Sequence, residues 1–175
     1  MILYRHADPR YPFLWESSGQ EPARWHAEGE GPVQYFADTP DGAWAEFVRH
    51  EGIREESELE NVRRALWAVD VPESPAAAVP RLSRASLTGG LASYAACRKE
   101  ARRLRAKGAS SLRAPSAALL PNGALAWRVD EGLRVATKKD GTVIVLFGAR
   151  PELTGWLAAF AARPHPDLLR RVRAL

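Results

Sequence analysis

Four side chains that lie far apart in the sequence are of types that can bind anions or stabilise charge during a reaction. Arg24 offers a planar fork of donors that suits a diphosphate. Glu46 could hold a ribose hydroxyl or stabilise a positive charge that develops on a sugar. Tyr35 could stack on a flat heterocycle, and the Ser116 hydroxyl could bond a phosphate oxygen or a carboxamide.

Each of these residues also has a common structural explanation. An arginine such as Arg24 often forms an ion pair or stacks on an aromatic ring. Glu46 could form an exposed pair with His50, which follows four residues later. Tyr35 could be an ordinary core tyrosine, and Ser116 could cap a turn. Only the four residues in combination point to a site.

Local sequence signals predict the elements that would position Tyr35 and Glu46. Residues 32–37 read as a strand that carries Tyr35. Thr39 and Pro40 are a strong helix start, since Thr39 can accept a bond from an early backbone N–H and proline suits the first helical position. Helical spacing then puts Glu46 at the edge of the apolar stripe of this helix, not in the middle of its solvent face.

The remaining elements follow from periodicity and from the positions of proline and glycine. We expect residues 72–80, which are rich in proline and alanine, to form a surface loop within one domain. The other predictions are an initial short strand, an extended piece at 23–26, strands at 64–71, 111–114, 125–129 and 142–147, a helix at 90–107, and one or two short helices in 151–162 and 166–175.

Composition bounds the class of protein. The chain has 175 residues, of which 46% are hydrophobic and 26% charged, and this is ordinary for one globular domain spanning residues 1–175. The net charge of +4 mildly favours anionic partners. A single cysteine, Cys97, excludes an internal disulfide. No signal peptide and no membrane span is evident, so we expect a cytoplasmic protein that does not bind membranes.

Several well-known site motifs are missing from the sequence. It contains no Cys/His cluster with zinc spacing, and no metal is expected. It has no phosphate-binding Gly-x-x-x-x-Gly-Lys-Ser/Thr loop, no Gly-x-Gly-x-x-Gly after a strand, and no Gly-x-Ser-x-Gly elbow. From the residues alone, a compact mixed α/β domain with an anion site is the prediction.

The order of the four candidates resembles the RES domain, a bacterial family named for an arginine, a glutamate and a serine. The first half of the resemblance is the run from Arg24-Trp25 through the Gly-Pro approach and the Tyr35 strand to the helix bearing Glu46. The second half is Ala114-Pro115-Ser116-Ala117. Many members have asparagine after the arginine–aromatic pair, where this chain has His26.

The resemblance implies a fold and a chemistry. The fold would be a single compact α+β domain with a mixed or mostly antiparallel central sheet, flanking helices and a core like that of the ADP-ribosyltransferase toxins. NAD would be the substrate: Arg24 would contact its phosphates, Tyr35 would line the nicotinamide side, Glu46 would steady the nicotinamide ribose and Ser116 would complete the pocket floor. Arg24, Glu46 and Ser116 would be the catalytic residues.

The resemblance also implies a biological role, with alternatives. The leading hypothesis is a toxin that cleaves the nicotinamide–ribose bond of NAD, as a glycohydrolase or a phosphorylase, and is neutralised by a cognate antitoxin protein. The alternatives are an ADP-ribosyltransferase acting on a protein target, and an inactive module that binds a nucleotide or a partner. The basic residues between Arg98 and Lys107 could be a solvated helix face or a surface for an acidic antitoxin. Nucleic acid would then be bound only indirectly, through the antitoxin, and the oligomeric state stays open.

Overall fold

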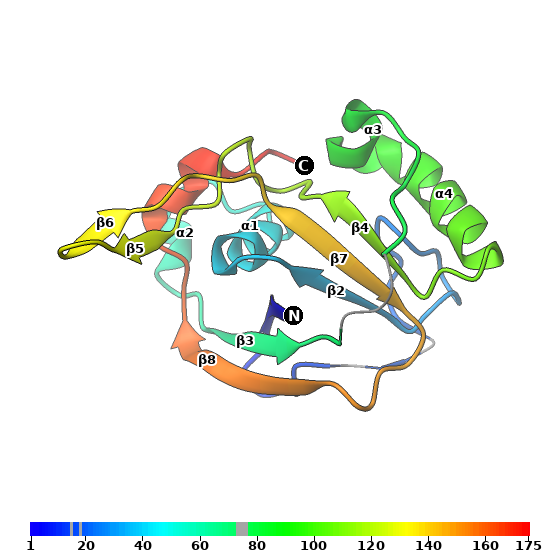
Figure 1. The fold of residues 1–175 in the computed structure, drawn as a ribbon, viewed down its shortest axis with the longest axis horizontal. Coiled ribbons are helices and arrows are strands. Elements are labelled where there is room, and N and C mark those ends of the chain that lie inside the picture. The colour runs from blue at the N-terminus through cyan, green and yellow to red at the C-terminus, as the bar shows by residue number, and fades with distance from the viewer. Residues whose placement is uncertain (15, 18, 73–76) are drawn as a thin grey trace.

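The fold is built on one antiparallel sheet. A computed structural model describes residues 1–14, 16–17, 19–72 and 77–175. Six strands form the sheet in the order β4-β7-β2-β1-β3-β8, and each neighbouring pair is antiparallel (Figure 1). The predicted α+β domain is therefore confirmed. The six strands are β1 (Ile2–Ala7), β2 (Val33–Ala37), β3 (Arg64–Asp70), β4 (Ser111–Pro115), β7 (Thr142–Phe147) and β8 (Thr154–Ala162).

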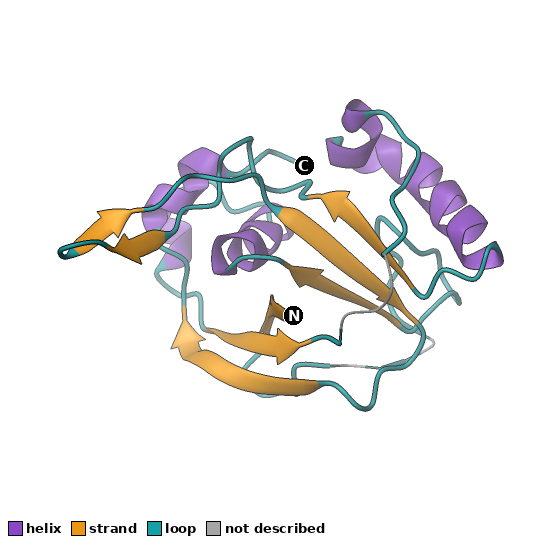
Figure 2. Cartoon of the chain, in the orientation of Figure 1, coloured by secondary structure: helices purple, strands orange, loops and turns teal. Residues whose placement is uncertain are grey.

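Helices flank the sheet, and a small hairpin projects from it. In Figure 2 the long helix α4 lies beside the β4 edge and α1 lies over the middle of the sheet. The hairpin pairs β5 (Trp127–Val129) with β6 (Leu133–Val135) outside the main sheet. The helices are α1 (Pro40–His50), α2 (Glu56–Leu59), α3 (Arg84–Thr88) and α4 (Tyr94–Ala106), with 3-10 turns at Leu91–Ser93 and Pro166–Arg171. None of the helices in the described ranges is long and apolar enough to cross a bilayer.

Strand alternation divides the core between the two faces of the sheet. On β7, Val143 and Val145 pack with the cluster that contains Cys97 and Leu104 of α4. Their neighbour Ile144 points the other way and joins a second cluster. That second cluster includes Leu3, Phe36, Val69, Val71, Leu146 and Leu153.

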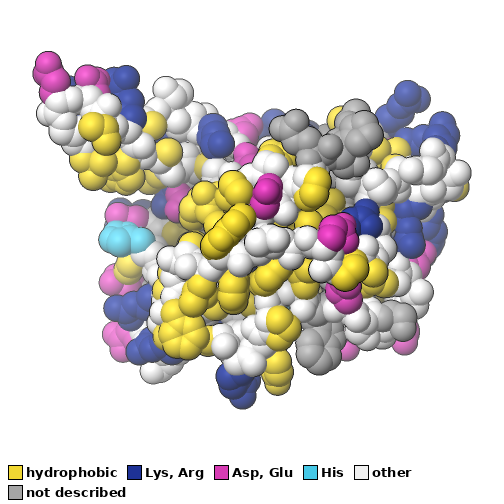
Figure 3. All heavy atoms as spheres, turned by 60° about the horizontal axis from the view of Figure 1, so that its bottom comes forward, with side chains coloured by type: hydrophobic (Ala, Val, Ile, Leu, Met, Phe, Trp, Pro, Cys, Tyr) yellow, Lys and Arg dark blue, Asp and Glu magenta, His cyan; other side chains and the backbone are white. Residues whose placement is uncertain are grey.

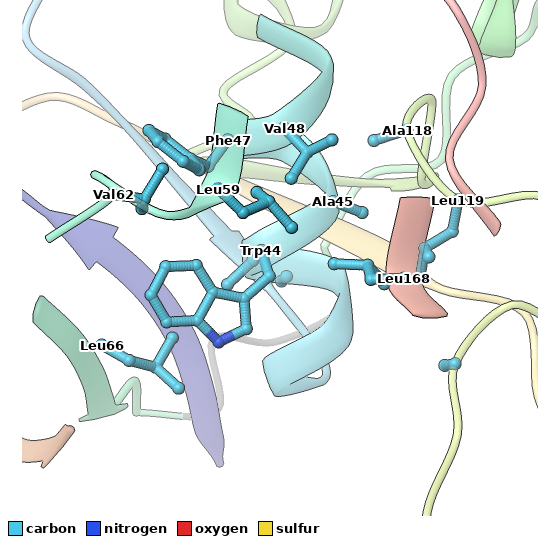
Figure 4. Close-up of a cluster of buried hydrophobic side chains, with 13 residues drawn as sticks. Trp44, Ala45, Phe47, Val48, Leu59, Val62, Leu66, Ala118, Leu119 and Leu168 are labelled. Atoms are coloured by element: carbon cyan, nitrogen blue, oxygen red, sulfur yellow. The ribbon is translucent and has the colours of Figure 1, made fainter. Parts of the chain in front are cut away.

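A third cluster holds α1 in place. Trp44, Phe47 and Val48 on the helix pack against side chains from α2, β3 and the C-terminal 3-10 turn (Figure 4). Gly42 allows the first turn of the helix to approach β2 closely, because a Cβ there would lie 2.9 Å from the Cβ of Ala37. The helix start matches the prediction, since the Thr39 hydroxyl accepts a hydrogen bond of 3.0 Å from the backbone N–H of Gly42.

Two sequence-based expectations are wrong, and a third holds only in part. Residues 154–162 form the edge strand β8, not a helix, and several of its apolar side chains are exposed on the face shown in Figure 3. The strand expected at 125–129 is present but shorter, as β5 (Trp127–Val129) of the hairpin. Residues 23–26 form a tight turn, closed by a bond from the Ala23 N–H to the His26 carbonyl, in place of an extended piece. Of the loop expected at 72–80, residues 73–76 lie outside the described residues.

Candidate active site

A pocket of about 280 Å³ opens where β1 and β2 separate. These two strands pair at a single position, Tyr4 with Ala37, whereas β1 pairs with β3 along its whole length, from Ile2 to Ala7. The sheet thus loosens at β1 and β2, and helix α1 flanks the opening. Its lining includes Arg24, Tyr35, Glu46, Arg49, Tyr94 and Pro115, together with Tyr4, His6 and His50.

Arg24 is buried in the pocket wall and is held by several acceptors. Its Nη1 donates to the Ser93 hydroxyl at 2.9 Å, and its Nη2 donates to the Gly89 carbonyl at 2.6 Å. Its guanidinium also lies over the ring of Tyr94, 4.6 Å from the centroid. The aromatic stack that was the structural alternative is therefore present, and it holds the guanidinium at the pocket.

The basic residues of α4 fix the segment that carries Arg24. Arg98 donates to the Ala23 carbonyl at 2.8 Å, and Arg105 donates to the Glu30 carbonyl at 3.2 Å. Arg102 forms an ion pair with the Glu30 carboxylate at 2.5 Å. These arginines are engaged within the molecule, so the basic stretch is largely a clamp on residues 23–30.

Tyr35 lines the pocket, and its hydroxyl pairs with His26, which is buried behind it. The Tyr35 hydroxyl lies 2.9 Å from His26 Nδ1 and accepts a bond of 3.1 Å from the Trp25 N–H. His26 Nε2 lies 2.8 Å from the Glu21 carbonyl, which can only accept, so Nε2 carries the proton and Nδ1 accepts from Tyr35. Burial lowers the pKa of His26, consistent with a neutral ring, and raises the pKa of Tyr35. These bonds fix the Tyr35 hydroxyl, so the Tyr35 ring is held in place at the pocket.

Glu46 and Ser116 meet across a long sequence separation. The Ser116 hydroxyl donates to Glu46 Oε1 at 3.1 Å and accepts from the backbone N–H groups of Ala118 and Leu119, each at 3.1 Å. Burial raises the pKa of Glu46 above its ordinary value of 4.5, while the bond from Ser116 and the charges of Arg49 and Arg24 oppose that rise. The site therefore holds a carboxyl group whose ionisation depends on these neighbours.

The structure thus brings three of the four sequence candidates to one cavity. Arg24, Tyr35 and Glu46 line it, and Ser116, which is 3% exposed, lies behind Glu46. Within the described parts of the chain, no three histidine, cysteine, aspartate or glutamate side chains are grouped as a metal ion would require. The cavity therefore offers guanidinium donors, which can bind an anion, with one carboxylate beside them.

Two residues of the pocket were missed by the sequence analysis. Tyr94 lies within the helix predicted at 90–107 but was not identified as a site residue, and it supplies the ring beneath Arg24. Arg49 was not singled out, yet it is 5% exposed and donates to the carbonyls of Gly89 and Ala117. The available signal was its position on α1, one turn after Glu46.

Comparison with models of protein families identifies the family of this chain. The family model of the RES domain matches residues 2–155, which include all four candidate residues and the whole pocket apart from the extreme C-terminus. No curated protein matches the chain.

Proposed function

This chain belongs to the RES domain family, and we propose that it cleaves the bond between nicotinamide and ribose in NAD. The observation that carries the proposal is the Glu46 carboxylate, bonded by Ser116 and sharing a pocket with the Arg24 guanidinium and the Tyr35 ring. A dinucleotide with a diphosphate, a flat cationic ring and a ribose between them matches these three groups. We expect this chemistry to need no metal ion and to use the carboxylate, the guanidinium and the aromatic ring.

The binding roles follow from the chemistry of each group. Arg24 would hold the diphosphate, because its planar donors match phosphate oxygens and the Tyr94 ring beneath it limits its motion. Tyr35 would pack its ring against nicotinamide, since its hydroxyl is already engaged by His26 and Trp25. With both ends of the substrate held, the glycosidic bond would lie between them, next to Glu46.

Glu46 would act on the reacting sugar. As the C–N bond breaks, its electron pair leaves with nicotinamide and a positive charge develops on the ribose. An ionised Glu46 would stabilise that charge. The bond from Ser116 favours the ionised form of Glu46, so Ser116 would act by positioning the carboxylate. Attack on the sugar by water would give ADP-ribose and a proton, and attack by inorganic phosphate would give a phosphorylated ADP-ribose.

A test is the loss of NAD, followed by mass spectrometry, with purified protein in the presence and absence of phosphate. We expect nicotinamide release, with a second product that identifies the acceptor. Glu46→Gln removes the negative charge and should slow release by at least about a hundredfold. Glu51→Gln, at an exposed position five residues later at the end of α1, should leave the rate unchanged. Intact NAD with the folded protein would refute the proposal, and label found on a macromolecule would indicate transfer to protein.

The biological part of the proposal is a toxin whose effect is relieved by a partner. Expression of the chain should deplete cellular NAD and arrest growth, and Glu46→Gln should do neither. A protein encoded beside it should restore growth when co-expressed. Growth arrest that persists with Glu46→Gln would separate toxicity from NAD cleavage and contradict this role.

A further inference from the structure

The second arginine of the pocket, Arg49, stands beside Arg24 without a carboxylate partner. Arg24 Nη2 and Arg49 Nη2 both donate to one oxygen, the Gly89 carbonyl, at 2.6 and 2.8 Å. The two guanidinium groups therefore face each other across a single neutral acceptor. Among the described residues neither has an acidic oxygen within ion-pairing distance, although both are less than a tenth exposed.

Two buried positive charges side by side are unfavourable unless an anion compensates for them. The acidic group whose charge acts on Arg49 is Glu46, one turn earlier on α1, and burial raises the pKa of Glu46 itself. Burial and the charge of Arg24 lower the pKa of Arg49. The pocket therefore carries an excess of positive charge at this end.

The bonding of Arg49 leaves donors free. Nη1 bonds to the Ala117 carbonyl and Nη2 to the Gly89 carbonyl, while the buried Nε has no acceptor among the described residues. A guanidinium has five N–H groups, so three N–H groups of Arg49 have no acceptor in the part of the chain that the structure describes. An unsatisfied buried donor beside a cavity is unfavourable and would be satisfied by an incoming oxygen anion.

The turn at Gly89 sets the spacing of the two arginines. A Cβ at this position would lie 2.7 Å from the Ala85 carbonyl and 3.2 Å from Ser93, so only glycine lets the chain pass here without a shift. The turn follows α3, and the next residues supply two contacts to Arg24: Ser93 at the end of the 3-10 turn and Tyr94 at the start of α4. The pair of guanidiniums is thus held by the fold before any ligand arrives.

We propose that Arg49 is a second phosphate-binding residue and that Arg24 and Arg49 together clamp one phosphate-type anion. The inference rests on the proposed function for the identity of its ligand, a nucleoside diphosphate derivative, but the clamp itself requires only phosphate oxygens. Those oxygens could belong to the diphosphate of a dinucleotide or to a free phosphate ion. Both present closely spaced anionic oxygens to two planar donor groups.

The experiment measures binding, not turnover, by calorimetric titration of the full chain with ADP-ribose at fixed ionic strength. Arg49→Gln should weaken ADP-ribose binding by about tenfold to a hundredfold, as expected when a charged hydrogen-bonding group is lost. Arg113→Gln removes the same charge from an exposed position on β4 and should have no effect. Arg49→Lys keeps the charge without the fork, so it should fold well and bind with intermediate affinity.

Competition identifies the source of the anion and separates binding from a structural role. Pyrophosphate that displaces ADP-ribose from the unmodified protein, but less effectively from Arg49→Lys, assigns the clamp to the diphosphate. Inorganic phosphate that binds alongside ADP-ribose with an affinity dependent on Arg49 assigns it to a free ion. Equal ADP-ribose and pyrophosphate affinities in Arg49→Lys and Arg113→Gln would overturn the inference, as would absence of any binding by the unmodified protein. A clamp that binds pyrophosphate in a protein that leaves NAD intact would sustain this inference and refute the proposed function.

Discussion

Ser116 acts on the pocket indirectly, through its hydrogen bond to the Glu46 carboxylate. Its oxygen accepts from two consecutive backbone N–H groups, so its own proton is directed at Glu46. The serine is almost fully buried, and it does not line the cavity. Ser116 is therefore a positioning residue whose hydrogen bond favours the ionised form of Glu46.

The first prediction concerns the pH dependence set by this pair. Glu46 must be ionised to stabilise a cation, so the rate of NAD cleavage should fall on the acid side, with a midpoint above 4.5 because burial raises the pKa of Glu46. The Ser116 bond lowers that pKa, so Ser116→Ala should move the acid limb to higher pH while its plateau is retained in part. Rates measured between pH 4 and 9 will check this. An acid limb that stays in place would show that Ser116 does not control Glu46.

The grouping of Arg24, Tyr35 and Glu46 came from their order along the chain, which resembles the RES domain, because each residue type alone has a common structural explanation. The helix and the strand that carry Glu46 and Tyr35 are strongly signalled by the local sequence. Arg49 could not be assigned in this way. Its acceptors are the carbonyls of Gly89 and Ala117, which lie 40 and 68 residues further along the chain. Backbone oxygens have no residue-type signature, so only the folded structure reveals this contact.

Helix α1 is the element on which the candidate site depends most, since it carries both Glu46 and Arg49. Its core-facing side chains and its glycine contact with β2 fix it against the sheet. Its start depends on one side-chain bond, from the Gly42 N–H to Thr39. The stability of this helix and the geometry of the pocket should therefore change together.

The second prediction tests the cap of α1. Thr39→Ala removes the acceptor and should lower the free energy of unfolding by about 1 kcal/mol. Thr39→Ser keeps a hydroxyl at the same position and should retain most of the stability. Urea denaturation followed by circular dichroism provides the measurement. If Thr39→Ala and Thr39→Ser were equally stable, the cap would not contribute to the fold.

Strand β8 shows why some elements could not be predicted. Residues 158–162 include four alanines, which favour helix in isolation, and β8 lies at the sheet edge with many exposed side chains that do not alternate. Pairing with β3 overrides this local preference, in a ladder with register shifts near Leu66. In contrast, β7 has neighbours on both sides and an almost continuous apolar sequence, which made it easy to predict.

For the whole molecule, buried histidines link stability to pH. Burial and neighbouring positive charges, those of Arg64 and Arg5 first, lower the pKa of His6 from 6.5 to about 3. Burial also lowers the pKa of His26. In both cases the unfolded chain binds the proton more readily than the folded one, so stability is fully present above pH 6.5 and is lost as the pH falls below it.

The third prediction is that this acid sensitivity depends on His6. Between pH 7 and pH 5 the free energy of unfolding should fall by up to about 2 kcal/mol through this residue. His6→Gln cannot be protonated and should show a smaller decrease over the same interval. His165→Gln changes an exposed histidine and should follow the unmodified protein. Urea titrations of the three proteins at both pH values make the comparison, and parallel losses in all three would exclude His6 as the cause.

Arg24 and Arg49 share a peptide oxygen as acceptor, and this affects the rate at which an anionic ligand associates with the protein. A carboxylate would have neutralised these cations, whereas the neutral carbonyl leaves their charge uncompensated, and we expect a positive electric field at the cavity. In a protein whose net charge is already +4, that field draws polyanions from solution toward the opening. Encounter with a nucleotide would therefore be accelerated in dilute buffer and slowed as ionic strength rises.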